Sequence, residues 1–214
     1  RMSDPRRVEV EFGFMTELER YEAFLELYRS EEPAHRETLE RLLAASDPYI
    51  PLILLQYLED IPERPALEAI LRLIEQGNEI VARAAMAVYG KNHYPGKARM
   101  LKALILSPSS RACRFAVRTL SRAGFSEILP LVLRDLPDRE GAVRLEMIEG
   151  LRYLPDRRSI ATLVHLAENS DEPARLAALQ ALAELQSRWR ALPAAFFLRR
   201  AQDESERVRR AALE

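Results

Sequence analysis

The feature that most constrains this chain is a sequence motif that returns at a fixed spacing of 31 residues. The repeat is clearest within residues 138–182, where Val143 and Leu151 of one copy correspond to Ala174 and Leu182 of the next. Three further copies precede these at the same phase, at Ile50 and Leu58, Val81 and Tyr89, and Ala112 and Leu120. A constant period of this length is typical of repeat proteins, in which each unit is one supersecondary element that packs on the next.

Each unit contains two amphipathic segments. In the motif itself the small and apolar residues recur at offsets of 0, 4, 7 and 8, which places them on one face of an α-helix, whereas a strand has a period of two. Apolar columns predict another helix in each unit, through Leu39, Ile70, Leu101, Val132, Leu163 and Ala194 and, four residues on, through Leu43, Ile74, Ile105, Leu136, Ala167 and Leu198. The predicted helix pairs are 35–45 with 47–60, 65–77 with 79–90, 96–107 with 109–122, 126–136 with 140–152, 157–169 with 171–187, and 190–202 with 204–214.

The motif combines an acidic turn, a Val-Arg pair, two small residues and a leucine. It is best seen at Glu140, Val143, Arg144 and Leu151, at Asp171, Ala174, Arg175, Ala178, Ala181 and Leu182, and in the turn Asp156-Arg157-Arg158. In these residues the chain resembles the HEAT repeat family, most closely its short bacterial variety, over roughly residues 35–214. The resemblance implies an all-α fold, a right-handed α-solenoid of about six helix pairs. It implies no single function, because HEAT-like proteins include adaptors, nucleic-acid binders and a few enzymes.

The N-terminal residues depart from the repeat pattern. Val8, Val10, Phe12 and Phe14 alternate with other residues, which predicts a short extended arm over residues 1–15, with an ordered tail packed over the first helix as the alternative. Residues 16–29 are predicted to form a helix that caps the end of the solenoid and begins with a capping box. Residues 16–214 are predicted to be a single domain. The start Arg1-Met2-Ser3 and an end without a helix cap predict a fragment of a longer protein.

Composition narrows the class of protein. The formal net charge of −1 gives the whole chain no general attraction to nucleic acid or to membranes. The longest apolar runs are far shorter than the roughly 18 residues that indicate a membrane span. Cys113 is the one cysteine, so it has no internal disulfide partner and favours a reducing compartment. The predicted location is cytoplasmic, with the soluble part of a membrane-anchored protein as the alternative.

The sequence offers no catalytic or metal-binding motif. It contains no Gly-rich phosphate loop, no paired-cysteine motif and no Gly-x-Ser-x-Gly elbow. The three histidines, His35, His93 and His165, fall in different repeats and lack the spacing of metal ligands. Cys113 has arginines nearby that would favour a reactive thiolate, but a small residue that fills a repeat position is the favoured interpretation. We therefore predict a protein that is not an enzyme and has no cofactor.

The most informative signal for function is a basic stretch in the middle of the chain. Between Ile80 and Ser126 there is no aspartate or glutamate, whereas residues 1–79 carry 18 acidic and 9 basic side chains. The nine basic residues are Arg83, Lys91, Lys97, Arg99, Lys102, Arg111, Arg114, Arg118 and Arg122. Six of them fall on equivalent faces of two second helices and form the predicted anion-binding or partner-binding site: Arg83, Lys91, Arg111, Arg114, Arg118 and Arg122. In HEAT-like proteins these helices line the concave surface, so the resemblance places the site in a groove.

The patch allows two interpretations. The arginine heads either bind an anionic partner, or they are solvated or paired with acids of neighbouring repeats, namely Glu146, Glu149, Glu184, Glu59 and Asp60. The preferred function is a protein-binding scaffold or adaptor that takes a partner with an acidic segment. Reversing Arg114 and Arg118 to glutamate is expected to abolish recognition without unfolding the chain.

The alternative function is nucleic-acid binding, as in the HEAT-like DNA glycosylases. Such enzymes need a carboxylate beside an aromatic pocket, but the basic stretch contains no carboxylate, and the one tryptophan, Trp189, is two repeats away. Tyr94 and Phe115 are the aromatic residues near the patch that suit base stacking. Another HEAT-like branch, the bilin lyases, offers no residue set that can be carried over to this chain.

Overall fold

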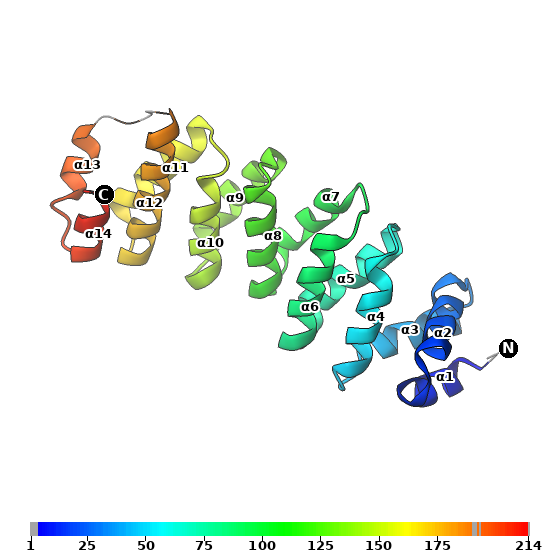
Figure 1. Ribbon diagram of the computed structural model, residues 1–214. Helices are drawn as coiled ribbons and strands as arrows, with labels where there is room; N and C mark the ends of the chain where they lie inside the picture. Colours follow the sequence, from blue (N-terminus) through cyan, green and yellow to red (C-terminus); the bar gives the residue numbers. More distant parts are fainter. Residues whose placement is uncertain (1–3, 190–191, 193, 214) are drawn as a thin grey trace. The chain divides into compact units, whose positions relative to one another are not determined.

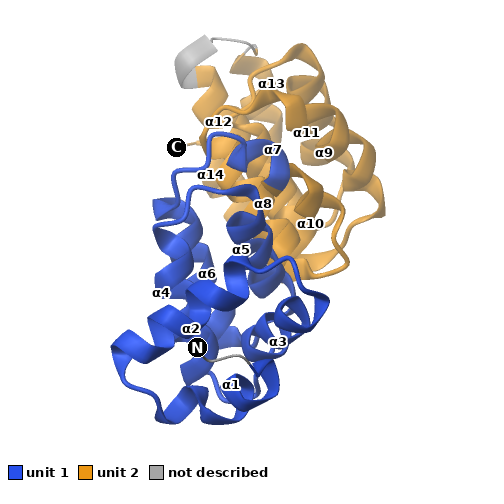
Figure 2. Ribbon diagram, turned by 90° about the vertical axis from the view of Figure 1, so that its right-hand side faces the viewer, with its two compact units in different colours: residues 1–100 blue, residues 101–214 orange. Residues whose placement is uncertain are grey.

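The computed structural model describes residues 4–189, 192 and 194–213, and every regular element in these residues is a helix (Figure 1). Stacked helix pairs recur along the chain, so the all-α solenoid expected from the sequence is confirmed. The chain divides into two compact units, Arg1–Met100 and Leu101–Glu214 (Figure 2). The single domain over 16–214 stays a prediction, and the two units are described separately below.

The first unit consists of short helices joined by tight links. They are α1 (Pro5–Glu11), a 3-10 turn (Phe12–Phe14), α2 (Glu17–Arg29), α3 (Pro33–Leu43), α4 (Tyr49–Glu59), α5 (Arg64–Gln76) and α6 (Glu79–Lys91), followed by α7 (Lys97–Lys102) at the boundary between the units. Helix α6 packs against both α4 and α5, and α2 packs against α3. The core is apolar, and its fully buried members include Phe24, Leu54 and Ile70.

The prediction of an extended N-terminal arm is wrong for residues 5–14, which form α1 and the 3-10 turn. Residues 1–3 lie outside the described part of the chain. The side chain of Asp4 accepts a hydrogen bond from the Arg6 N–H, and a proline follows it in the first turn of the helix. Val8 and Phe12 are buried four residues apart, while Val10 is 75% exposed. Spacing by four defines the buried face, so the apparent alternation misled the prediction. Because α1 packs on α3, the ordered-tail alternative is closer to the structure.

The capping box predicted at the start of α2 is confirmed. The Glu19 N–H donates to the Thr16 hydroxyl at 3.4 Å, and the Thr16 N–H donates to the Glu19 carboxylate at 2.8 Å. The Thr16 hydroxyl also donates to the Glu19 carboxylate at 2.8 Å, and the two bonds donated by the backbone and side chain of Thr16 lower the pKa of the exposed Glu19 carboxyl. Local sequence alone therefore set where this helix begins.

The second unit has two layers of helices. Helices α8 (Ser110–Arg122), α10 (Gly141–Leu151), α12 (Glu172–Trp189) and α14 (Glu206–Ala211) stand side by side (Figure 1). The other layer contains α9 (Leu129–Asp135), α11 (Arg157–Asn169) and α13 (Ala194–Arg200), together with 3-10 turns at Ala103–Leu106, Ser126–Ile128 and Leu136–Asp138. The predicted helix 190–202 is observed from residue 194, while residues 190, 191 and 193 lie outside the described residues.

Two predicted helices are broken up by 3-10 turns. The segment 96–107 ends in the turn Ala103–Leu106, and 126–136 consists of α9 between two such turns. Prolines lie close to these turns: Pro108 follows the first segment, and Pro130 and Pro137 lie within or just after the second. Turns of the 3-10 type are common at helix ends.

Helices α8 and α10 approach closely because a glycine lies between them. A Cβ atom added to Gly150 would lie 3.1 Å from Val117 Cγ1 and 3.2 Å from Ser121 Oγ. Ser121 is itself buried and donates to the Val117 carbonyl oxygen at 2.6 Å, so it has little freedom to move. The glycine therefore sets the separation of the two helices.

Gly150→Leu is expected to lower the free energy of unfolding by about 1–3 kcal/mol, because the added side chain overpacks the α8–α10 contact. Urea denaturation followed by circular dichroism measures this change. Gly90→Leu is the matched control: Gly90 is also helical, but a Cβ atom added to it would have open space within 4 Å. That substitution should be neutral or stabilise the protein by up to about 1 kcal/mol through helix propensity. Equal effects of the two substitutions would contradict the packing argument.

Candidate functional site

The four arginines predicted on the 109–122 helix lie together in the structure. Helix α8 carries Arg111, Arg114, Arg118 and Arg122, and this set is called the arginine face below. The opposite side of the helix is core, since Ala112, Ala116 and Leu120 are buried. Spacing by three and four residues along a helix brings the four guanidinium groups to one side.

A buried carboxylate from the next repeat lies at the centre of the arginine face. Arg118 Nε donates to Glu146 Oε1 at 2.9 Å, Arg118 Nη2 contacts Glu146 Oε2, and Arg114 Nε lies 3.7 Å from the same oxygen. The Glu146 side chain is 7% exposed. The hydrogen bond to Glu146 raises the pKa of Arg118, so the guanidinium stays charged. The alternative of pairing across repeats is confirmed for these two arginines. The basic stretch of sequence contains no carboxylate, but the folded surface around it does, because Glu146 comes from the next repeat.

The end of the arginine face is aromatic. The Arg122 guanidinium lies 5.9 Å from the ring centroid of Tyr153, and Arg152 lies 4.7 Å from the same centroid. Arg152 also pairs with Glu184 at 2.9 Å. Arg122 is exposed and forms no ion pair within the described residues. The Arg122 charge therefore has no carboxylate partner among the described residues, and the cation–π contact with Tyr153 orients the side chain.

The other two predicted site residues belong to the first unit, where each has an acidic neighbour. Arg83 Nη2 lies 3.2 Å from Glu79 one helical turn away, and the Arg83 side chain is 79% exposed. Lys91 Nζ lies 3.1 Å from Glu59 on α4, which was one of the proposed alternative partners. A single patch of six cations stays a prediction, whereas the arginine face of α8 is one surface within its own unit.

Lys97 of the basic stretch has a structural role that the sequence pattern did not predict. Its Nζ donates to the backbone oxygens of Tyr89, Gly90 and Asn92, at 3.2, 3.1 and 2.9 Å. These carbonyls end helix α6, so the lysine charge caps the negative end of the helix. A lysine a few residues beyond the end of a predicted helix was the signal that could have revealed this contact.

Cys113 is a packing residue rather than an exposed thiol. It is fully buried, and its Sγ lies 3.1 Å from the carbonyl oxygen of Ile105. Burial raises the pKa of the Cys113 thiol, which disfavours the thiolate. Among the residues that the structure describes, no group of three or more His, Cys, Asp or Glu side chains is arranged to hold a metal ion. No helix within the described ranges is long and apolar enough to cross a membrane.

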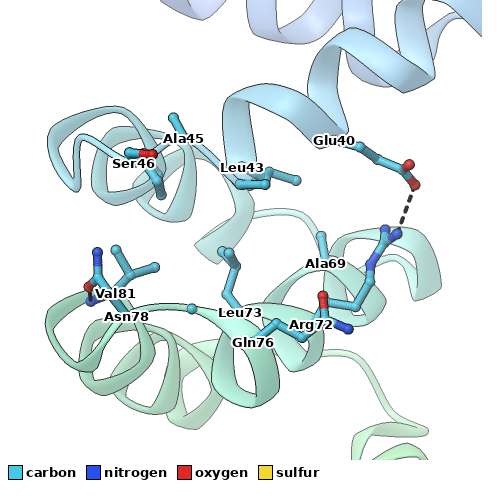
Figure 3. A pocket seen from close by; sticks show the side chains of 13 residues that line it. Glu40, Leu43, Ala45, Ser46, Ala69, Arg72, Leu73, Gln76, Asn78 and Val81 are labelled. Atoms are coloured by element: carbon cyan, nitrogen blue, oxygen red, sulfur yellow. Dashed lines mark hydrogen bonds and ion pairs between the residues drawn. The ribbon is translucent and has the colours of Figure 1, made fainter.

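A separate cavity of about 550 Å³ opens in the first unit, between the α3–α4 link and the α5–α6 link (Figure 3). Leu43, Leu73 and Val81 form apolar parts of its wall, and an ion pair of 2.8 Å between Arg72 and Glu40 lies at one side. None of the predicted site residues lines this cavity.

The structure thus defines a class of protein: stacked helix pairs in which charged side chains reach the neighbouring repeat, as Arg118 reaches Glu146 and Arg72 reaches Glu40. Residues 128–214 match a family model described as HEAT repeats. This match supports the HEAT-like repeat family that the motif indicates. No curated protein matches the chain in sequence. HEAT repeats are generally protein-interaction scaffolds and are usually not enzymes, because stacked units present extended surfaces rather than enclosed sites.

Proposed function

We propose that this chain is a non-enzymatic scaffold or adaptor that binds an acidic segment of a protein partner through the arginine face of α8. The observation that carries the proposal is the charge balance of that surface. Four arginines share one face of α8, and Glu146 is the one carboxylate buried among them within the described residues. Glu149 is also close enough to act on Arg118, and the four arginines outnumber these two acids, which favours a positive potential at the face.

Glu146 also supports binding by preorganising the surface. A guanidinium that is already held by a buried carboxylate loses less rotamer freedom when it contacts a partner. Arg118 is held in this way by two of its nitrogens, and Arg122 is oriented by Tyr153. Complementary charge then speeds association and selects acidic over basic partners.

The test replaces the outer arginines and leaves the Glu146 contacts intact. We expect Arg111→Gln with Arg122→Gln to weaken binding of the acidic peptide acetyl-(Glu-Ala)6-amide about tenfold, which corresponds to about 1.4 kcal/mol. Isothermal titration calorimetry on the 214-residue chain at low salt measures the affinity. The matched control is Arg134→Gln with Arg157→Gln, which removes two exposed charges from α9 and α11 in the other layer of the same unit.

Equal weakening by the control pair would contradict a local site and indicate a general charge effect. Duplex DNA serves as the second probe, because binding to a phosphate backbone weakens steeply as salt increases. If DNA binds more tightly than the peptide and the Arg111 and Arg122 substitutions weaken it, the nucleic-acid alternative replaces the proposed one.

A further inference from the structure

A second surface, in the first unit, has the opposite chemistry. A cavity of about 310 Å³ opens between α2, the end of α4 and the link that leads to α5. The aromatic and charged side chains of its lining are Tyr21, Tyr28, Tyr57, Asp60, Glu63 and Arg29. None of these residues belongs to the arginine face or to the cavity beside Arg72.

Three tyrosines form a fixed aromatic wall. The rings of Tyr21 and Tyr57 meet edge to face with centroids 5.1 Å apart, and Phe24 packs behind them at 5.3 Å from Tyr57 and 5.6 Å from Tyr28. Phe24 is fully buried, whereas Tyr21 is 44% exposed. The wall is therefore anchored in the core and still accessible to a ligand, and a ring face presents negative potential to a cation.

Two carboxylates accompany the aromatic wall. Glu63 accepts a hydrogen bond of 3.1 Å from the Tyr28 hydroxyl, which ties it to the wall, and Asp60 is exposed at the end of α4. Neither carboxylate forms an ion pair within the described part of the chain. Arg29 also lines the cavity, so the lining carries two acids against one base. The surrounding sequence has the same sign, with 18 acidic and 9 basic residues in positions 1–79.

We propose that this cavity binds an arginine side chain from a basic segment of a partner protein. A guanidinium is planar, stacks on tyrosine faces and pairs with carboxylates through parallel N–H donors, so one side chain satisfies both features of the lining. The unit contains a guanidinium–tyrosine contact within its own fold, where Arg20 lies 5.7 Å from the ring centroid of Tyr49 and donates to its hydroxyl at 3.0 Å. A lysine would meet the carboxylates but cannot stack in the same planar way.

The proposal goes beyond the arginine face and does not depend on it. One site attracts an acidic segment and the other a basic segment, and each lies within a single compact unit. A substitution that abolishes binding at one of these two sites is therefore expected to leave binding at the other site unchanged.

The test uses three peptides that differ at one position: acetyl-Ala-Ala-Arg-Ala-Ala-amide and its Lys and Gln versions. Ring resonances of Tyr21, Tyr28 and Tyr57 are followed by NMR in the full chain labelled at tyrosine. The Arg peptide is expected to shift these resonances with a dissociation constant on the order of 1 mM, the Lys peptide to bind several-fold more weakly, and the Gln peptide to leave them unchanged. Asp60→Asn with Glu63→Gln should weaken the Arg peptide about tenfold, because the amides keep the shape and remove the charge.

The control pair is Glu22→Gln with Glu31→Gln, which removes the same charge from two exposed positions outside the cavity. It is expected to change the affinity less than twofold, since distant surface charges are screened. Tyr21→Leu tests the aromatic wall separately and should also weaken binding. Equal shifts with the Gln peptide, no shift with the Arg peptide, or equal weakening by the control pair would each overturn the proposal. The amide spectrum of each variant verifies that it is folded.

Discussion

Arg175→Met is expected to lower the free energy of unfolding of the second unit by about 3–5 kcal/mol, because it leaves a buried carboxylate without its partner. Arg175 is 11% exposed and Asp203 is 6% exposed, and their side chains meet at 2.9 Å. Arg175 also donates to the Ser170 carbonyl oxygen and to Glu204, so one side chain ties α12 to the turn that precedes α14. Unfolding in guanidinium chloride measures the loss of stability, and hydrogen exchange should locate that loss in the C-terminal helices.

The acid side of the pH profile tests this explanation further. Burial alone would raise the pKa of Asp203, but hydrogen bonds from the Ser205 N–H and from Arg175 outweigh it and lower the pKa. A carboxyl with a lowered pKa in the folded state stabilises the protein above its unfolded pKa of about 3.9, and this stabilisation is lost as the pH falls through the folded value. The difference between wild type and Arg175→Met should therefore shrink below about pH 4.

An exposed pair provides the control for Arg175. Arg207 is 75% exposed and lies 4.0 Å from Glu172, so Arg207→Met should cost less than about 1 kcal/mol. A loss of the same size at both positions, or an unchanged difference in acid, would contradict the role assigned to the buried pair.

Reversing Arg114 and Arg118 to glutamate is expected to destabilise the second unit by more than about 3 kcal/mol. The substitution places two new carboxylates beside Glu146, which is 7% exposed and has Arg118 as its closest cation. The sequence alone predicts loss of recognition with an intact fold, but the structure shows that these two arginines neutralise a buried acid. Thermal and urea unfolding of the double variant measure the effect.

Adding Glu146→Gln to that double variant should recover more than half of the lost stability, because it removes the charge at the centre of the cluster. Glu146→Gln by itself should cost less than the reversal, since Arg114 and Arg118 are 42% and 47% exposed and can be solvated. A double variant as stable as wild type would show that Glu146 does not depend on the arginines.

Much of the fold could be predicted because it rests on local signals. The helix at 157–169 was expected with the bounds that α11 has, since Asp156 caps its first turn and apolar residues recur along one face. Thr16 and Glu19 define the start of α2 in the same way. These interactions join residues within four positions of each other, so reading the sequence in order finds them.

The candidate site was only partly accessible to the same reasoning. The helical face of Arg111, Arg114, Arg118 and Arg122 follows from spacing, but the choice of Glu146 as the buried counter-ion does not. Glu146 is 28 positions from Arg118, and the sequence offered several other acids of neighbouring repeats as possible partners of these arginines. The N-terminal arm shows the same limit, since burial of Val8 and Phe12 in the packed unit distinguishes a helix from an alternating strand.

By itself the sequence determined the period, the phase and the helix pairs of this protein, because hydrophobic spacing and helix caps act over a few residues. Only the tertiary structure decided which charges are neutralised, with Lys97 on the end of α6, Arg118 on Glu146 and Arg175 on Asp203. It also brought three tyrosines of α2 and α4 together with two carboxylates at one cavity. Such contacts depend on how stacked helices exclude water from particular side chains, and burial is a property of the packed chain rather than of any short segment.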